Sequence, residues 1–95
     1  MPKYNIKDEK EFYKAILSLN TIEECKNFFD DICTIQEIEA ISQRLQVAKQ
    51  LSLGKSYIEI NKTTGASTAT ICRVSKSLNY GDGGYATVLN RIAEE

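Results

Sequence analysis

The alternation of apolar and polar positions divides the chain into amphipathic segments separated by short polar turns. Apolar residues recur three and four positions apart, the spacing of one helix face, in four stretches: residues 8–19, 22–32, 38–48 and 85–92. No stretch alternates apolar and polar residues over enough positions to suggest a β-strand. The sequence therefore predicts an all-α fold, with one domain over residues 1–95.

Polar residues at the ends of these stretches predict where the helices begin and end. Thr21 and Thr34 each precede a glutamate by three residues, which is the spacing of an N-terminal capping box. Gly54 follows the third stretch and can adopt the left-handed conformation that ends many helices. The third helix, running from Thr34 toward Gly54, is therefore expected to be the longest.

Residues 56–78 predict two short helices joined by a tight turn, the arrangement of a helix-turn-helix. Gly65 offers a left-handed conformation between the helices, and Ser67 is a good N-cap for the second one. We expect five apolar side chains to lock the two helices at an angle: Ile60, Ala66, Ile71, Val74 and Leu78.

This arrangement leaves Thr68, Ala69 and Thr70 at the exposed start of the second helix, with Ser67 directly before them. Their small side chains would allow the backbone to approach base edges in a major groove, and threonine can bond to bases or to phosphate. Lys62 and Lys76 would contact phosphates, assisted by the backbone donors at the helix N-terminus. Residues 62–76 contain no acidic residue, so the region is locally basic.

Overall composition narrows the function classes. Twelve basic and thirteen acidic residues give a net charge of -1, which disfavours a purely electrostatic nucleic-acid or membrane coat protein. With no histidine, no phosphate-binding loop and no evident carboxylate pair, we expect neither an enzyme nor a metal site, and no cofactor. The three cysteines are interpreted as reduced core residues. With no signal peptide or membrane span, a cytoplasmic location is expected.

Two alternatives remain open at this point. The basic segment could be an ordinary helical hairpin with a solvated face, or a protein-interaction module that docks on an acidic partner through its 62–76 surface. The broad apolar faces of the first two helices and the last helix predict a homodimer that covers them, but a compact monomeric bundle could also pack them internally.

The segment Gly65-Ala66-Ser67-Thr68-Ala69-Thr70-Ile71-Cys72-Arg73-Val74-Ser75-Lys76-Ser77-Leu78 resembles the turn and recognition helix of the bacterial Trp repressor. Residues 34–40, Arg44 and Gly54 resemble that family's third helix, so the likeness covers about half of the chain. More narrowly, the sequence is similar to the Trp-repressor-related YerC/YecD group of probable transcriptional regulators. The resemblance implies six helices and an intertwined homodimer that binds double-stranded DNA. Residues 1–54 and 84–95 would form the dimer core, and residues 55–80 the reading head.

The resemblance also implies an effector pocket. In the Trp repressor two arginines sandwich the indole of tryptophan, and they match Arg44 and Arg73; Thr34 and Ser77 align with further positions around that pocket. Val74 departs from the family pattern, because the Trp repressor has glycine there and a valine side chain occupies space beside the indole. We therefore expect an effector other than tryptophan. Arg44 and Arg73 could equally be surface arginines held by acidic neighbours.

Overall fold

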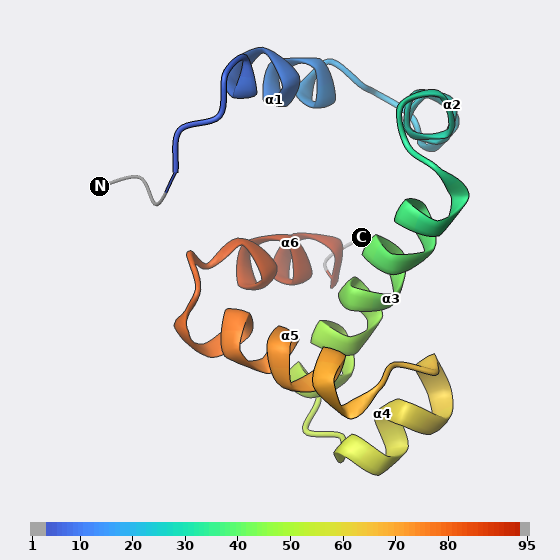
Figure 1. The fold of residues 1–95 in the computed structure, drawn as a ribbon, viewed down its shortest axis with the longest axis vertical. Coiled ribbons are helices and arrows are strands. Elements are labelled where there is room, and N and C mark those ends of the chain that lie inside the picture. Colours follow the sequence, from blue (N-terminus) through green and yellow to red (C-terminus); the bar gives the residue numbers. More distant parts are fainter. Residues whose placement is uncertain (1–3, 94–95) are drawn as a thin grey trace. The chain divides into compact units, whose positions relative to one another are not determined.

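The computed structural model describes residues 4–93, in which every regular element is a helix (Figure 1). The six helices are α1 (Glu9–Leu17), α2 (Ile22–Ile32), α3 (Ile35–Ser52), α4 (Tyr57–Thr64), α5 (Thr68–Tyr80) and α6 (Gly84–Ala93). This confirms the all-α class. The chain folds as two compact units that divide between Ile35 and Gln36, so α1 and α2 belong to the first unit and nearly all of α3, with α4–α6, to the second.

The first unit contains two capped helices and an aromatic cluster. Thr21 begins α2, its side-chain oxygen accepting a hydrogen bond from the Glu24 N–H at 3.0 Å. The Glu24 carboxylate in turn accepts a hydrogen bond from the Asn20 N–H at 2.8 Å. A capping box predicts the N–H of Thr21 as the donor, so the observed donor is one residue earlier. The rings of Phe12 and Phe28 lie 6.4 Å apart. Neither α1 nor α2 contains a buried residue, so the apolar faces of this unit remain open.

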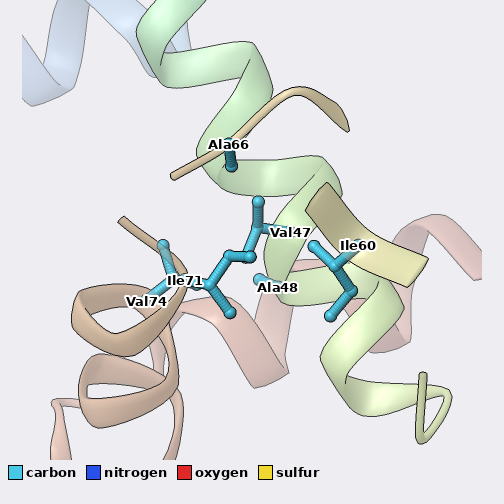
Figure 2. Packing of buried hydrophobic residues seen from close by; sticks show 6 residues of the cluster. All are labelled: Val47, Ala48, Ile60, Ala66, Ile71 and Val74. Atoms are coloured by element: carbon cyan, nitrogen blue, oxygen red, sulfur yellow. The ribbon is translucent and has the colours of Figure 1, made fainter. Parts of the chain in front are cut away.

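The second unit closes around a small apolar core (Figure 2). Six residues are almost completely buried, contributed by α3, α4, the following turn and α5: Val47, Ala48, Ile60, Ala66, Ile71 and Val74. Leu51 of α3 and Tyr85 and Leu89 of α6 pack against this core. The predicted locking residues Ile60, Ala66, Ile71 and Val74 are all in it, and Leu78 is half-buried. Burial of these side chains positions α4 and α5 relative to α3.

The C-terminus of α3 has the geometry that the sequence predicts for Gly54. Gly54 has a φ of 80°, and its N–H donates to the Leu51 carbonyl at 3.0 Å. The Lys55 N–H donates to the Gln50 carbonyl at 3.1 Å. This pair of hydrogen bonds is a Schellman motif, which satisfies carbonyls at the helix end and directs the chain into α4.

The interpretation of the cysteines as core residues is wrong. Cys25 and Cys72 are exposed, Cys33 is half-buried, and all three are free. Cys72 follows Ile71 directly on α5, and consecutive helical residues point about 100° apart. Because Ile71 faces the core, Cys72 faces outward.

Candidate nucleic-acid interface

Helix α4 begins with a complete capping box. The Ser56 side chain accepts a hydrogen bond from the Glu59 N–H at 3.2 Å, and the Glu59 carboxylate accepts one from the Ser56 N–H at 3.3 Å. These reciprocal bonds satisfy two backbone donors that a helix start leaves unpaired. The Ser-x-x-Glu spacing is visible in the sequence and could have predicted this cap.

The turn between α4 and α5 is held by hydrogen bonds on both sides of Gly65. Gly65 adopts the predicted left-handed conformation, with a φ of 75°, and its N–H donates to the Asn61 carbonyl at 2.9 Å. The Asn61 side-chain amide reaches across the turn and donates to the Ala66 carbonyl at 2.8 Å. The Ala66 N–H donates to the Thr64 hydroxyl at 3.1 Å. The angle between the two helices, visible in Figure 1, is therefore fixed by the hydrogen bonds of the turn as well as by packing in the core.

Ser67 caps α5 as predicted. Its side-chain oxygen accepts from the Thr70 N–H at 3.1 Å, and its hydroxyl donates to the Thr70 hydroxyl, also at 3.1 Å. Thr70 is half-buried and its hydroxyl is engaged within the cap, whereas Thr68 and Ala69 are exposed. The first turn of α5 carries no acidic residue. It therefore presents small, uncharged side chains at the positive end of the helix dipole.

The basic candidates lie on both helices of the motif. Lys62 is exposed in the last turn of α4, and Lys76 is exposed on α5. Thr68, Cys72 and Lys76 are spaced four residues apart, so they lie along one face of α5, and all three are exposed. The four-residue spacing from Thr68 to Cys72 and Lys76 is a signal in the sequence that could have placed Cys72 on this face.

The five effector-pocket candidates have different environments. Val74 is 2% exposed and belongs to the core, so its side chain fills the space beside Ile71 and Val47 rather than lining an open site. Arg44 on α3 and Arg73 and Ser77 on α5 are exposed. Thr34 belongs to the first unit and the other four residues to the second.

One residue that sequence reasoning missed ties α3 to this motif. The side-chain amide of Gln43 donates to the carbonyl of Thr64, the last residue of α4, at 3.1 Å. Gln43 comes 21 residues before its partner, and no local spacing rule connects them. By contrast, an asparagine four residues before a turn glycine is a visible signal, and it could have pointed to Asn61.

The described residues contain neither a candidate metal site nor a candidate membrane-spanning helix. Within residues 4–93, no three histidine, cysteine, aspartate or glutamate side chains are grouped so that they could hold a metal ion. No helix in the part of the chain that the structure describes is long and apolar enough to cross a lipid bilayer.

The chain is similar to known proteins over most of its length. Residues 7–93 match the family model described as Trp repressor protein. The chain belongs to the Trp repressor family. The uncharacterized protein YerC of Bacillus subtilis is 50% identical over 88 residues, which are 93% of this chain and 85% of YerC.

Two solved structures of Trp-repressor-like proteins are similar along nearly the whole chain. A crystal structure from Staphylococcus aureus, described as a Trp repressor candidate, has a TM-score of 0.85 and 46% identity, and the match covers 96% of this chain and 98% of that one. A TrpR-like protein from Eubacterium eligens has a TM-score of 0.90 and 47% identity, with coverages of 94% and 92%. Membership in the Trp repressor family thus rests on both sequence and fold.

Proposed function

We propose that this protein is a sequence-specific, DNA-binding transcriptional regulator that places α5 in the major groove of double-stranded DNA. The observation that carries the proposal is the start of α5, where Thr68 and Ala69 are exposed next to a capped and hydrogen-bonded turn. A helix that enters a groove must present small or hydrogen-bonding side chains on a rigid support. Membership in the Trp repressor family supports the same role.

Contacts to phosphate would come from local positive charge, since the net charge of the chain is -1. Lys62 and Lys76 are both exposed, and the first turn of α5 has no carboxylate that would repel a phosphate. Thr70 contributes to this surface chiefly by holding Ser67, because its hydroxyl is engaged in the cap. We therefore expect Thr68 and Ala69 to determine which bases are preferred, and the two lysines to strengthen binding to any DNA sequence.

The working form in this proposal is a homodimer. Leu17 is 82% exposed and Ile22 is 88% exposed, although both are large apolar side chains. A second copy of the chain would remove such side chains from water. With two reading heads, the operator is expected to be a pseudo-palindrome whose half-sites lie about 34 Å apart.

The proposal does not include tryptophan as the effector. The buried side chain of Val74 lies where the Trp repressor has glycine, and making room for an indole would require disrupting the core around Ile71. Titration calorimetry with L-tryptophan is expected to give no heat of binding. A saturable heat that disappears in the Arg44→Ala variant would contradict this expectation and would restore the family pocket.

The proposed function can be tested by selecting fragments of the source genome with the purified protein at physiological salt and sequencing them. Enrichment of a pseudo-palindrome would support the regulator. On the enriched site, Lys76→Ala should weaken binding equally for all sequences, whereas Thr68→Ala should change the preferred base. Lys14→Ala, which removes an exposed lysine from α1, is the matched control and should change neither.

Salt-dependent binding without any sequence preference would contradict sequence-specific regulation. It would leave open the alternative in which the basic surface docks on an acidic protein partner.

A further inference from the structure

A groove lies between α3 and α4 in the second unit, apart from the start of α5. It consists of two adjoining hollows, of about 320 Å³ and about 260 Å³, which share Gln46, Gln50 and Thr63 in their walls. The first hollow is also lined by Lys49, Leu53, Lys55 and Glu59, and the second by Ser42, Gln43 and Thr64. Together they offer space of the order that small-molecule sites occupy.

The charge of the groove is positive. Lys49 and Lys55 both line it, and Glu59 is the only acidic residue in its walls. The Glu59 carboxylate already accepts hydrogen bonds from the Ser56 N–H and hydroxyl, so it is committed to the cap of α4. With two lysines and one glutamate, the lining residues carry a net charge of +1, and the carboxylate is held in the cap of α4.

The remaining wall residues supply neutral donors and acceptors. Gln46 and Gln50 carry side-chain amides, and the Thr63 hydroxyl donates to the Gln50 side-chain oxygen at 2.7 Å. A ligand that bonds Gln50 would compete with this contact. Amides and hydroxyls that flank two lysines match a compact anion that also has oxygen atoms to accept hydrogen bonds.

We infer that the groove between α3 and α4 binds a small organic acid with two or more carboxylate groups. One carboxylate pairs with Lys49 and another with Lys55, and the glutamine amides donate to the remaining oxygens. Such pairing at a solvated site gives weak binding, on the order of millimolar, because water and salt screen exposed ion pairs.

The groove adjoins the contacts that hold the helix-turn-helix. Thr63 and Thr64 end α4 directly before Gly65, and Gln43 holds the Thr64 carbonyl. Occupation of the groove would redistribute the hydrogen bonds of Gln43 and Gln50 and change the position of this end of α4. Control of DNA affinity by the acid rests on the proposed function, whereas binding of the acid does not.

Binding is tested by titrating the uniformly ¹⁵N-labelled protein with sodium citrate or sodium succinate and following its amide signals. We expect saturable shifts of the Gln46 and Gln50 side-chain amides and the Thr63 backbone amide. The Lys49→Gln/Lys55→Gln double variant should bind at least tenfold more weakly, and the matched Lys10→Gln/Lys14→Gln variant on α1 should bind normally.

Sodium chloride of equal ionic strength is the control for nonspecific screening. Shifts that it reproduces, shifts that persist in the Lys49→Gln/Lys55→Gln variant, or no saturable shift with either acid would overturn the site. A folded spectrum of that variant without acid shows that any loss of binding is not due to unfolding.

The regulatory step has a separate readout. Citrate should change the affinity for an enriched DNA site in the wild type but not in the Lys49→Gln/Lys55→Gln variant, as measured by fluorescence anisotropy. Equal effects in both proteins would overturn the coupling and leave the site intact. A protein that binds citrate but selects no DNA would overturn the proposed function alone.

Discussion

The two units of this protein begin helices with the same kind of N-cap, but they differ in whether they bury apolar side chains. Thr21 caps α2 in the first unit, and Ser56 and Ser67 cap α4 and α5 in the second. Yet α1 and α2 contain no buried residue, whereas all six core residues lie between Val47 and Val74. Capping thus forms helices in both units, but only the second unit contains a buried apolar core.

This contrast shows that helix formation and core formation are separate requirements. The first unit has rings in contact, such as Phe28 and Phe29 with centroids 5.5 Å apart, but it lacks a layer that would cover them. In the second unit α3, α4, α5 and α6 all contribute to one cluster. We therefore expect the stability of the second unit to be internal and that of the first to depend on association.

The largest effect is expected from Ile71→Ala. Ile71 is fully buried, so the truncation leaves a cavity and should lower the free energy of unfolding by about 2–5 kcal/mol. Denaturant unfolding followed by circular dichroism measures this loss. The matched change Ile58→Ala, at a side chain that is 72% exposed, should stay within about 0.5 kcal/mol. Similar losses for both variants would remove the distinction between core and surface.

A smaller effect, of a different kind, is expected from Leu17→Ala in the first unit. If a second copy covers this exposed side chain, its loss should weaken association by about 1.5–3 kcal/mol, or roughly tenfold or more in the dissociation constant. Sedimentation equilibrium over a range of concentrations measures this constant. Ile58→Ala serves again as the control. An unchanged dissociation constant for Leu17→Ala would show that this face does not associate.

The two helix caps allow a direct comparison of the units. Thr21→Ala and Ser67→Ala each remove an N-cap hydrogen bond of 3.0–3.1 Å and should each cost about 1 kcal/mol of stability. Only Ser67→Ala should also weaken binding to a selected DNA site, because it loosens the start of α5. Thermal unfolding and anisotropy measure the two effects. Equal losses of DNA affinity would show that DNA binding at the start of α5 does not depend on the Ser67 cap.

The smallest effects are expected at the exposed cysteines. Cys25→Ser and Cys72→Ser should each change the free energy of unfolding by less than about 0.5 kcal/mol, because neither thiol packs in the core. Denaturant unfolding at one fixed protein concentration is sufficient to test this. A loss above 1 kcal/mol at Cys25 alone would indicate that association buries it.

The helices, the caps at Thr21 and Ser67, and the turns at Gly54 and Gly65 could be predicted from the sequence. Each depends on residues no more than five positions apart, and the chemistry of those residues restricts the backbone directly. The inward positions of Ile60, Ile71 and Val74 could be predicted as well, since one apolar face must be buried once two helices meet at a turn.

The features that could not be predicted depend on packing between distant segments. The Gln43 contact to Thr64 and the groove walls at Gln46 and Gln50 involve polar residues with no motif, brought together only when α3 meets α4. The spacing of the cysteines argues against a metal site, but it carries no information on which helix face each thiol occupies. Thr70 was expected to be exposed with its neighbours, but the cap draws its hydroxyl toward Ser67.

The residues that hold α5 in place differ from the residues that are free to vary during evolution. Its support comes from Ser67, from the Asn61 bond across the turn and from the buried Ile71 and Val74. Thr68, Ala69 and Cys72 take no part in that support. Substitutions at these three positions can therefore accumulate with little loss of stability, so under the proposed function the preferred DNA sequence could change while the scaffold stays unchanged.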